Sequence, residues 1–216
     1  MDRKVLHKLS YGLYVVTTTF EGRMNGQIAD AVMQVNAAPK QTVALSLNND
    51  NFTTELVKKS GKIALSILSQ NYDPQIITNF GMQSGRNVDK FAVFPPQISA
   101  SGLPYYTGSG FCGWLEGTVI EQQTVGSHTI FVIEVTEGAL CDDLQPLIYA
   151  DYLNRKRQPQ TTAEPVPQTE VKAAEPAAGD EPTWRCTICG HTVQGDLDEN
   201  YRCPLCGVGR ELFERI

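Results

Sequence analysis

Apolar and polar residues alternate along much of the first 150 positions, which is the pattern of β-strands with one buried face. Turn residues separate these segments, and the turn around Gly126 lies between the last two of them. The predicted strands are Leu13–Thr19, Gln27–Gln34, Thr42–Leu47, Lys62–Leu68, Phe111–Glu121 and Thr129–Thr136. Asn25-Gly26 is a candidate hairpin turn before the second strand.

Short helices are expected between and before these strands. Apolar residues share one helical face near the N-terminus, Ser60-Gly61 ends a second helical segment, and Pro74 suits the first turn of a third. The predicted helices are Asp2–Leu9, Thr53–Lys59 and Pro74–Phe80. Several strands with few helices predict a mainly β fold, a β-barrel with short helices, and argue against a doubly wound sheet.

Residues 156–182 differ abruptly in composition from what precedes them. This stretch holds five of the twelve prolines, no aromatic residue and only two valines as large aliphatic residues. It cannot bury enough apolar surface to offset the entropy of ordering, so we predict a flexible, semi-extended linker. The expected domains are therefore residues 1–155 and 183–216, with the linker between them.

Composition and charge narrow the function. The 216 residues carry a formal charge of −6, which disfavours nucleic acid as a partner. The N-terminal residues lack the apolar segment of a secretory signal, and no apolar run is long enough to span a membrane. These features predict a cytoplasmic protein with no membrane partner.

Four of the six cysteines crowd together near the C-terminus as two C-x-x-C pairs. They are Cys186, Cys189, Cys203 and Cys206. Cysteines three apart in a tight turn can direct both sulfurs at one ion, and four sulfurs suit either zinc or a single iron. Disulfides are the third possibility. Cys112 and Cys141 stand apart, and we expect them to be small buried residues.

The residues around these pairs resemble the rubredoxin family in its short form. Trp184 lies two residues before the first pair, the second pair reads C-P-x-C-G, and Phe213 follows it. The resemblance implies that the four cysteines hold one iron that cycles between ferric and ferrous states. The chain lacks the longer insert of full-length rubredoxins, and His191 stands where the family often has tyrosine.

The first 150 residues resemble the flavin reductase-like split-barrel family. The matching segments, in the family's order, are LSYGLYVVTTT, QIADAVMQV, ALSLNNDNFTTELVKKSGKIALSIL, SGRNVDKF and GSHTIFVIEV. The resemblance implies a split β-barrel that binds FMN, accepts electrons from NAD(P)H and usually forms a homodimer.

Individual residues of these segments suit a flavin site. Thr53 and Thr54 stand at an expected helix N-terminus, where hydroxyl and amide groups favour a phosphate, although a plain helix cap is the alternative. Lys90 can pair with the same phosphate or lie at the surface as a solvated lysine. Small Ala29 and Ala31 leave room for a flavin ring against backbone, or serve tight barrel packing.

The resemblance also places His128 near the flavin and the nicotinamide, as the candidate catalytic residue; a surface histidine at a strand end is the alternative. The complete set of expected flavin contacts is Asn25, Ala29, Asp30, Ala31, Val32, Ser46, Leu47, Asn48, Thr53, Thr54, Lys90 and His128.

One further motif is set aside. Residues 108–113 match G-x-G-x-x-G, but the residues that follow alternate like a strand, whereas a dinucleotide-binding loop must open a helix. We expect Phe111, Trp114 and Phe131 to be core residues.

Together the two resemblances predict a protein that converts two-electron into one-electron chemistry. Similar fusions in anaerobic bacteria imply transfer from NAD(P)H through FMN and iron to an acceptor such as a flavodiiron protein that reduces oxygen or nitric oxide. Three alternatives stay open: a reductase that releases reduced flavin, a flavoredoxin-like carrier reduced by another protein, and a barrel with a zinc interaction module.

Overall fold

The structure is a computed structural model that describes residues 5, 8–141, 144–157, 182–186, 192–199, 201–203 and 209–216. The chain divides into two compact units, Met1–Ala150 and Asp151–Ile216. Most of the predicted linker and the histidines at 7 and 191 lie outside the described residues. The described part of the chain contains no helix long and apolar enough to cross a membrane.

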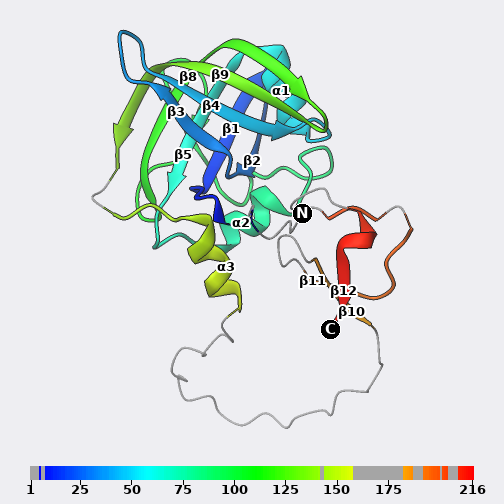
Figure 1. Cartoon of the computed structure of the whole chain (residues 1–216). Helices are drawn as coiled ribbons and strands as arrows, with labels where there is room; N and C mark the ends of the chain where they lie inside the picture. The colour runs from blue at the N-terminus through cyan, green and yellow to red at the C-terminus, as the bar shows by residue number, and fades with distance from the viewer. Residues whose placement is uncertain are drawn as a thin grey trace. The chain divides into compact units, whose positions relative to one another are not determined.

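The larger unit is mainly β, as predicted (Figure 1). Its strands are β1 (Tyr14–Phe20), β2 (Arg23–Ala29), β3 (Val32–Asn36), β4 (Thr42–Asn48), β5 (Lys62–Leu68), β6 (Gln97–Ile98), β7 (Pro104–Tyr105), β8 (Phe111–Val125) and β9 (His128–Leu140). Its helices are α1 (Phe52–Ser60) and α2 (Pro74–Gly81), and α3 (Tyr149–Arg157) follows at its end.

Seven antiparallel strands form one curled sheet in the order β2-β1-β5-β8-β9-β4-β3. The two edge strands, β2 and β3, are consecutive in the chain and only Asp30 and Ala31 separate them. Because two residues cannot cross a flat sheet of seven strands, the sheet must curl until its edges meet. The backbone N–H of Ser46 donates to the carbonyl of Ala31 at this closure, 3.0 Å away.

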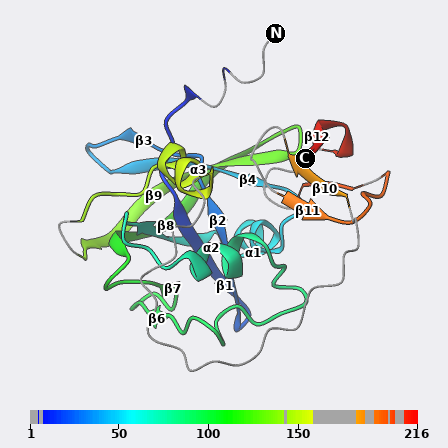
Figure 2. The ribbon, with the colours of Figure 1, turned by 90° about the horizontal axis from the view of Figure 1, so that it is seen from below.

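The barrel interior is filled by aliphatic residues that alternate inward along the strands. Val43, Leu45 and Leu47 of β4 face Phe131 and Ile133 of β9 in this core. Helix α1 packs against β1 and β2, and α2 packs against β2, so both helices lie beside the β1–β2 edge (Figure 2). This arrangement places the N-terminus of α1 next to β2.

Two expectations about the second strand are wrong. Asn25-Gly26 is not a turn: the chain reverses at Glu21 and Gly22, both at positive φ, and Asn25 lies within β2. A glycine is needed at 26 for another reason, since a Cβ there would lie 3.0 Å from the ring of Phe80. The segment Gln27–Gln34 is not one strand either, because barrel closure divides it at Asp30.

The other predicted strands and the helices near Thr53 and Pro74 are confirmed in position; β5 has the predicted ends, and the ends of the others differ. The hairpin of β8 and β9 extends to Val125 and Leu140, and Gly126 forms its turn as predicted. The G-x-G-x-x-G segment runs into strand β8, so setting it aside was correct. Phe111 and Phe131 are buried, as predicted, whereas Trp114 is only half-buried and its ring lies 4.0 Å from that of Tyr105 at an interplanar angle of 32°. The predicted helix Asp2–Leu9 falls mostly outside the described residues.

The second unit contains a small three-stranded antiparallel sheet. Its elements are β10 (Thr183–Cys186), β11 (Thr192–Gln194), the 3₁₀ turn Arg210–Leu212 and β12 (Phe213–Arg215), with β10 in the centre. Cys186, Leu197, Cys203 and Phe213 are buried together, and Tyr201 meets Phe213 edge to face. With so few apolar residues the unit needs a further stabilising element, such as a metal.

Candidate functional site

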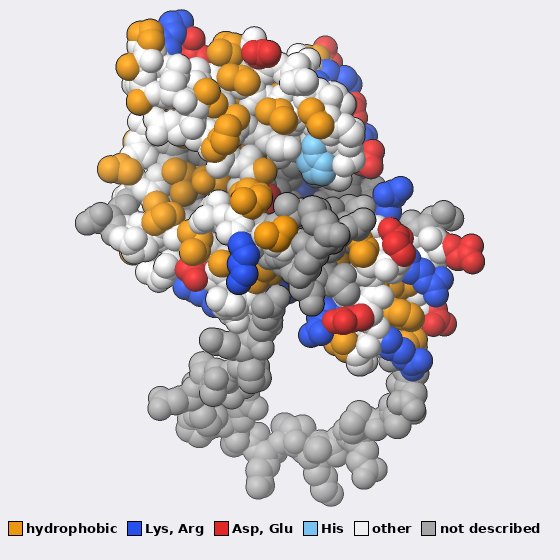
Figure 3. Space-filling view, in the orientation of Figure 1, with side chains coloured by type: hydrophobic (Ala, Val, Ile, Leu, Met, Phe, Trp, Pro, Cys, Tyr) orange, Lys and Arg blue, Asp and Glu red, His pale blue; other side chains and the backbone are white. Residues whose placement is uncertain are grey.

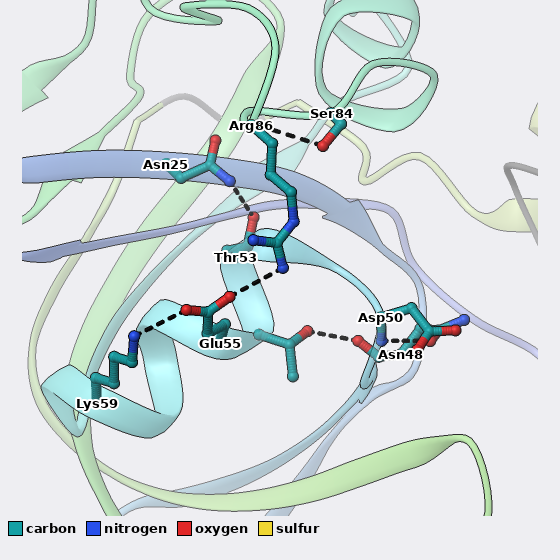
Figure 4. Close-up of polar contacts among 9 residues, drawn as sticks. Asn25, Asn48, Asp50, Thr53, Glu55, Lys59, Ser84 and Arg86 are labelled. Atoms are coloured by element: carbon teal, nitrogen blue, oxygen red, sulfur yellow. Dashed lines mark hydrogen bonds and ion pairs between the residues drawn. The ribbon is translucent and has the colours of Figure 1, made fainter.

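The corner between β4 and α1 is built by Asn48. Its side-chain oxygen accepts from the backbone N–H of Asp50, and its carbonyl accepts from the Thr54 hydroxyl at 2.7 Å (Figure 4). These bonds turn the chain from the strand into the helix within three residues. The Thr54 hydroxyl is therefore engaged in a hydrogen bond within the protein. Asn51, at the N-cap of α1, makes no side-chain capping bond.

The N-terminus of α1 meets β2 and the loop after α2. The Asn25 amide donates to the Thr53 hydroxyl at 3.0 Å, and both side chains are buried. Gly85 lies so close that a Cβ there would be 2.0 Å from the Asn25 side-chain oxygen. Arg86, the next residue, extends over α1 and binds Glu55 at 2.9 Å (Figure 4).

Positive charge gathers around this meeting point. The guanidinium groups of Arg23 and Arg86 lie 4.3 and 4.8 Å from the ring of Phe52. Hydrogen bonds from Lys59 and Arg86 hold the pKa of Glu55 below its usual value. A cavity of about 440 Å³ opens between residues 22–25 and residues 85–91. Helix N-terminus, arginines and amide groups together suit an anion such as a phosphate.

Lys90 closes the inner side of this cavity but directs its ammonium group into the protein. The Nζ donates to the carbonyls of Gly26 at 2.9 Å and Phe80 at 3.1 Å, and the side chain is 4% exposed. The Asn79 amide donates to the Lys90 carbonyl at 2.8 Å. Burial lowers the pKa of Lys90 to about 8. A direct contact between Lys90 and a flavin phosphate stays a prediction.

A second group of predicted residues lies where the barrel closes. His128 is paired with Asn48 across β9 and β4, and Ser46 follows two residues earlier on the same face. The Nδ1 of His128 lies 2.9 Å from the Ser127 hydroxyl. Burial raises the pKa of Asp30, while backbone amides and the nearby His128 act in the opposite direction. Burial, and secondly the charge of Asp30, raises the pKa of Tyr14.

The predicted flavin contacts therefore fall into two groups joined by the corner at Asn48. Asn25 and Lys90 line the cavity, and Thr53 is hydrogen-bonded to Asn25. Asp30, Ala31, Ser46 and His128 lie at the barrel closure. Ala29 and Leu47 belong to the hydrophobic core and Val32 packs against it, so only their backbones are available to a ring at the barrel closure. Their contact with flavin stays a prediction.

Sequence reasoning missed Arg86 and Gly85. Both belong to the segment SGRNVDKF, from which only Lys90 was selected, because its charge suggested a phosphate ligand. In this segment, Gly85 followed by Arg86 was the better indication of a residue that reaches the phosphate site. The glycine permits close approach to Asn25, and the arginine then reaches the helix N-terminus.

Two of the four predicted metal ligands lie among the described residues. Cys186, at the end of β10, and Cys203 are 1% and 2% exposed and share one small buried cluster. Cys189 and Cys206 lie outside the described residues, so within the described part no set of three or more ligands is found. Two thiols buried together, with two more close in sequence, fit a four-sulfur metal site.

Comparison with known proteins gives matches over both units. A model of the flavin reductase like domain matches residues 6–157, and a model of the rubrerythrin, rubredoxin-like domain matches residues 184–214. A high molecular weight rubredoxin of Moorella thermoacetica is 35% identical over the full length of both chains.

Two further relatives match the larger unit. A ferric-chelate reductase (NAD(P)H) of Archaeoglobus fulgidus is 34% identical, covering 74% of this chain and 95% of that protein. The structure of an FMN-binding protein from Thermus thermophilus aligns with a TM-score of 0.55 at 25% identity, covering 62% of this chain and 73% of that one.

Proposed function

The chain belongs to the flavin reductase-like family and continues into a rubredoxin-like domain, and from this premise we propose an electron-transfer oxidoreductase. It accepts electrons from NAD(P)H and delivers them one at a time to an acceptor protein. FMN binds the barrel, and one iron binds Cys186, Cys189, Cys203 and Cys206. The observation that carries this proposal is the joining of a flavin-type domain and a four-cysteine domain in one polypeptide.

Each cofactor has support in residues of the chain. The cavity beside Arg23 and Arg86 suits the phosphate of FMN, and the relative from Thermus thermophilus is an FMN-binding protein. The buried thiols of Cys186 and Cys203 suit iron. Bound flavin supplies the exchange between hydride and single electrons, and iron on four thiolates supplies a one-electron site. The residues of the chain position these groups and exclude water from them.

The barrel closure is the proposed place of the flavin ring and the nicotinamide. The Ser46 N–H and the Ala31 carbonyl bond each other there, and Asp30 and Asn48 contribute polar side chains next to His128. His128 orients the nicotinamide, because the imidazole stands at the strand end with one nitrogen beside Ser127. The donor NAD(P)H is supported by the ferric-chelate reductase (NAD(P)H) relative. We place this reaction in the cytoplasm, where such donors are available.

A homodimer is part of the proposal. Met33, Val125 and Ile130 are exposed on the face of the sheet that also carries Ser46 and His128, as the strand register requires. Apolar side chains gather over β3, β4 and the β8–β9 hairpin on the side seen in Figure 3. Exposed apolar surface of this kind marks a contact with another protein surface. A second copy here would cover the flavin ring.

Iron on four thiolates is anionic, so an acceptor with a basic patch is favoured, and a flavodiiron protein is our proposed acceptor. Lys156 and Arg157 belong to helix α3, so the predicted linker starts too early at 156. A linker that follows this helix would let the iron domain visit first the flavin and then the acceptor.

The test is the visible spectrum and metal content of anaerobically purified protein, before and after addition of NADH or NADPH. The proposal predicts one iron and one FMN per chain, with both absorptions bleached by a nicotinamide. Zinc in place of iron would contradict the relay. A bound flavin that stays oxidised would identify a carrier reduced by another protein, and flavin that dissociates on reduction would identify a source of free reduced flavin.

A further inference from the structure

Two cysteines that the proposed function does not use face each other across the β8–β9 hairpin. The register of the two strands pairs Gly113 with Leu140, so Cys112 stands opposite Cys141. The ladder continues to this pair, because the backbone N–H of Cys141 donates to the carbonyl of Cys112 at 2.9 Å. Both carry thiols. Residues directly opposite in antiparallel strands direct their side chains to the same face.

The backbone geometry is compatible with a disulfide. Opposed residues that share a backbone hydrogen bond have Cα atoms about 5.5 Å apart, within the range of roughly 4.4–6.8 Å that a disulfide spans. The Cys112 sulfur lies 3.7 Å from the carbonyl of Leu68, a weak contact that a side-chain rotation would release. The Cα separation of an ideal pair of this kind is therefore within the range of a disulfide.

The two thiols differ in environment. Cys112 is buried, as predicted, whereas the prediction for Cys141 was wrong, because it is partly exposed at the end of the hairpin. Burial, and secondly the proximity of Cys141, raises the pKa of the Cys112 thiol. A buried protonated thiol reacts slowly with oxidants in solution, so Cys141 is the residue that an oxidant meets first.

We propose that Cys112 and Cys141 form a redox-active pair that a hydroperoxide oxidises to a disulfide. The Cys141 thiolate attacks the peroxide, whose O–O bond breaks, giving a sulfenic acid on Cys141 and, with hydrogen peroxide as oxidant, one water. The Cys112 sulfur then attacks the Cys141 sulfur, releasing a second water as the S–S bond forms. The two thiols lose two electrons and two protons, which the peroxide takes up.

The sequence allows a clean test in the full-length chain. No lysine or arginine lies between positions 112 and 141, so trypsin leaves both cysteines on one peptide. Cleavage after glutamate, with Glu-Pro bonds left intact, places Cys112 in residues 56–116 and Cys141 in residues 138–170. The four cysteines of the second unit fall in residues 171–199 and 200–211.

The protein is treated with hydrogen peroxide, denatured, alkylated and cleaved after glutamate, and the peptides are weighed by mass spectrometry. The expected result is joint loss of alkylation at Cys112 and Cys141 and a linked pair of peptides that a reductant separates. In Cys112→Ser the expected product is instead Cys141 oxidised to the sulfinic or sulfonic acid. Any of three results with wild-type protein would overturn the proposal. Both thiols could stay alkylated, Cys141 alone could be over-oxidised, or either cysteine could be linked to a peptide from residues 171–211.

Discussion

Replacing Lys90 with methionine tests whether this lysine is a buried clamp of the cavity loop. In the structure its ammonium bonds two carbonyls, one on β2 and one at the end of α2, inside the protein. Burial lowers the pKa of Lys90 from 10.5 to about 8. At about 1.36 kcal/mol per pKa unit, this is a cost of roughly 3 kcal/mol for keeping the charge in the folded state.

The sign of the pH dependence follows from that shift. Below pH 8 the lysine is charged in both folded and unfolded chains, so the folded state carries the full cost. Between pH 8 and 10.5 the folded state releases the proton first, and the unfolded state binds more protons. The free energy of unfolding of the wild type should therefore rise, relative to Lys90→Met, by about 3 kcal/mol across this window. The neutral amine still donates to both carbonyls.

The assay is urea unfolding of flavin-free protein at pH 7.5 and pH 10, in a Trp184→Phe background so that Trp114 alone reports on the barrel. Lys62→Met, at an exposed lysine, is the matched control and should change the unfolding free energy by less than about 0.5 kcal/mol at either pH. The account of Lys90 as a buried clamp would be refuted if the unfolding free energy of the wild type, relative to Lys90→Met, stayed constant or fell with pH. If the same measurement with FMN bound reversed this pH dependence, Lys90 would be a phosphate ligand.

Three more predictions concern the two sites. Gly85→Ala should lower flavin affinity and destabilise the barrel by about 1–3 kcal/mol in thermal unfolding, because its Cβ would collide with Asn25; unchanged unfolding and affinity would contradict the packing. Arg86→Ala should weaken FMN binding about tenfold in fluorescence titration, through loss of one charge-assisted contact, and leave riboflavin binding unchanged; equal losses for both would place Arg86 away from the phosphate. Cys186→Ser should abolish iron binding in metal analysis while NADH still reduces the flavin; iron retained at full occupancy would exclude this ligand.

The sequence predicted the elements that local pattern determines. Alternation located β4, β5 and the long hairpin, and Pro74 located the start of α2, where Asp73 also caps the helix. The break at Asp30 could not be predicted, because the residues on either side alternate like a single strand. Only the meeting of the two sheet edges, a property of all seven strands together, requires the chain to bend there.

The site was predicted in its residue types more than in their arrangement. Thr53 and Asn25 were predicted separately as flavin contacts, with a helix cap and a hairpin turn as the alternatives, yet they bond each other across β2 and α1. Lys90 was chosen for its charge, which the fold turns inward. Both the Asn25–Thr53 bond and the inward direction of Lys90 depend on contacts between segments far apart in the sequence, which local sequence patterns do not indicate. The spacing of the four cysteines, by contrast, is local and was sufficient to predict a metal site.

The most direct test of the central proposal is anaerobic reduction of the full-length chain by excess NADH or NADPH, once with FMN bound and once with FMN removed. Absorbance is followed at both the flavin bands and the ferric–thiolate bands. If the barrel passes electrons to the four-cysteine site, both absorptions bleach in the loaded protein, and the iron stays oxidised when FMN is absent. Iron that is reduced equally well without FMN, or that stays oxidised beside a fully reduced flavin, would contradict the proposed transfer.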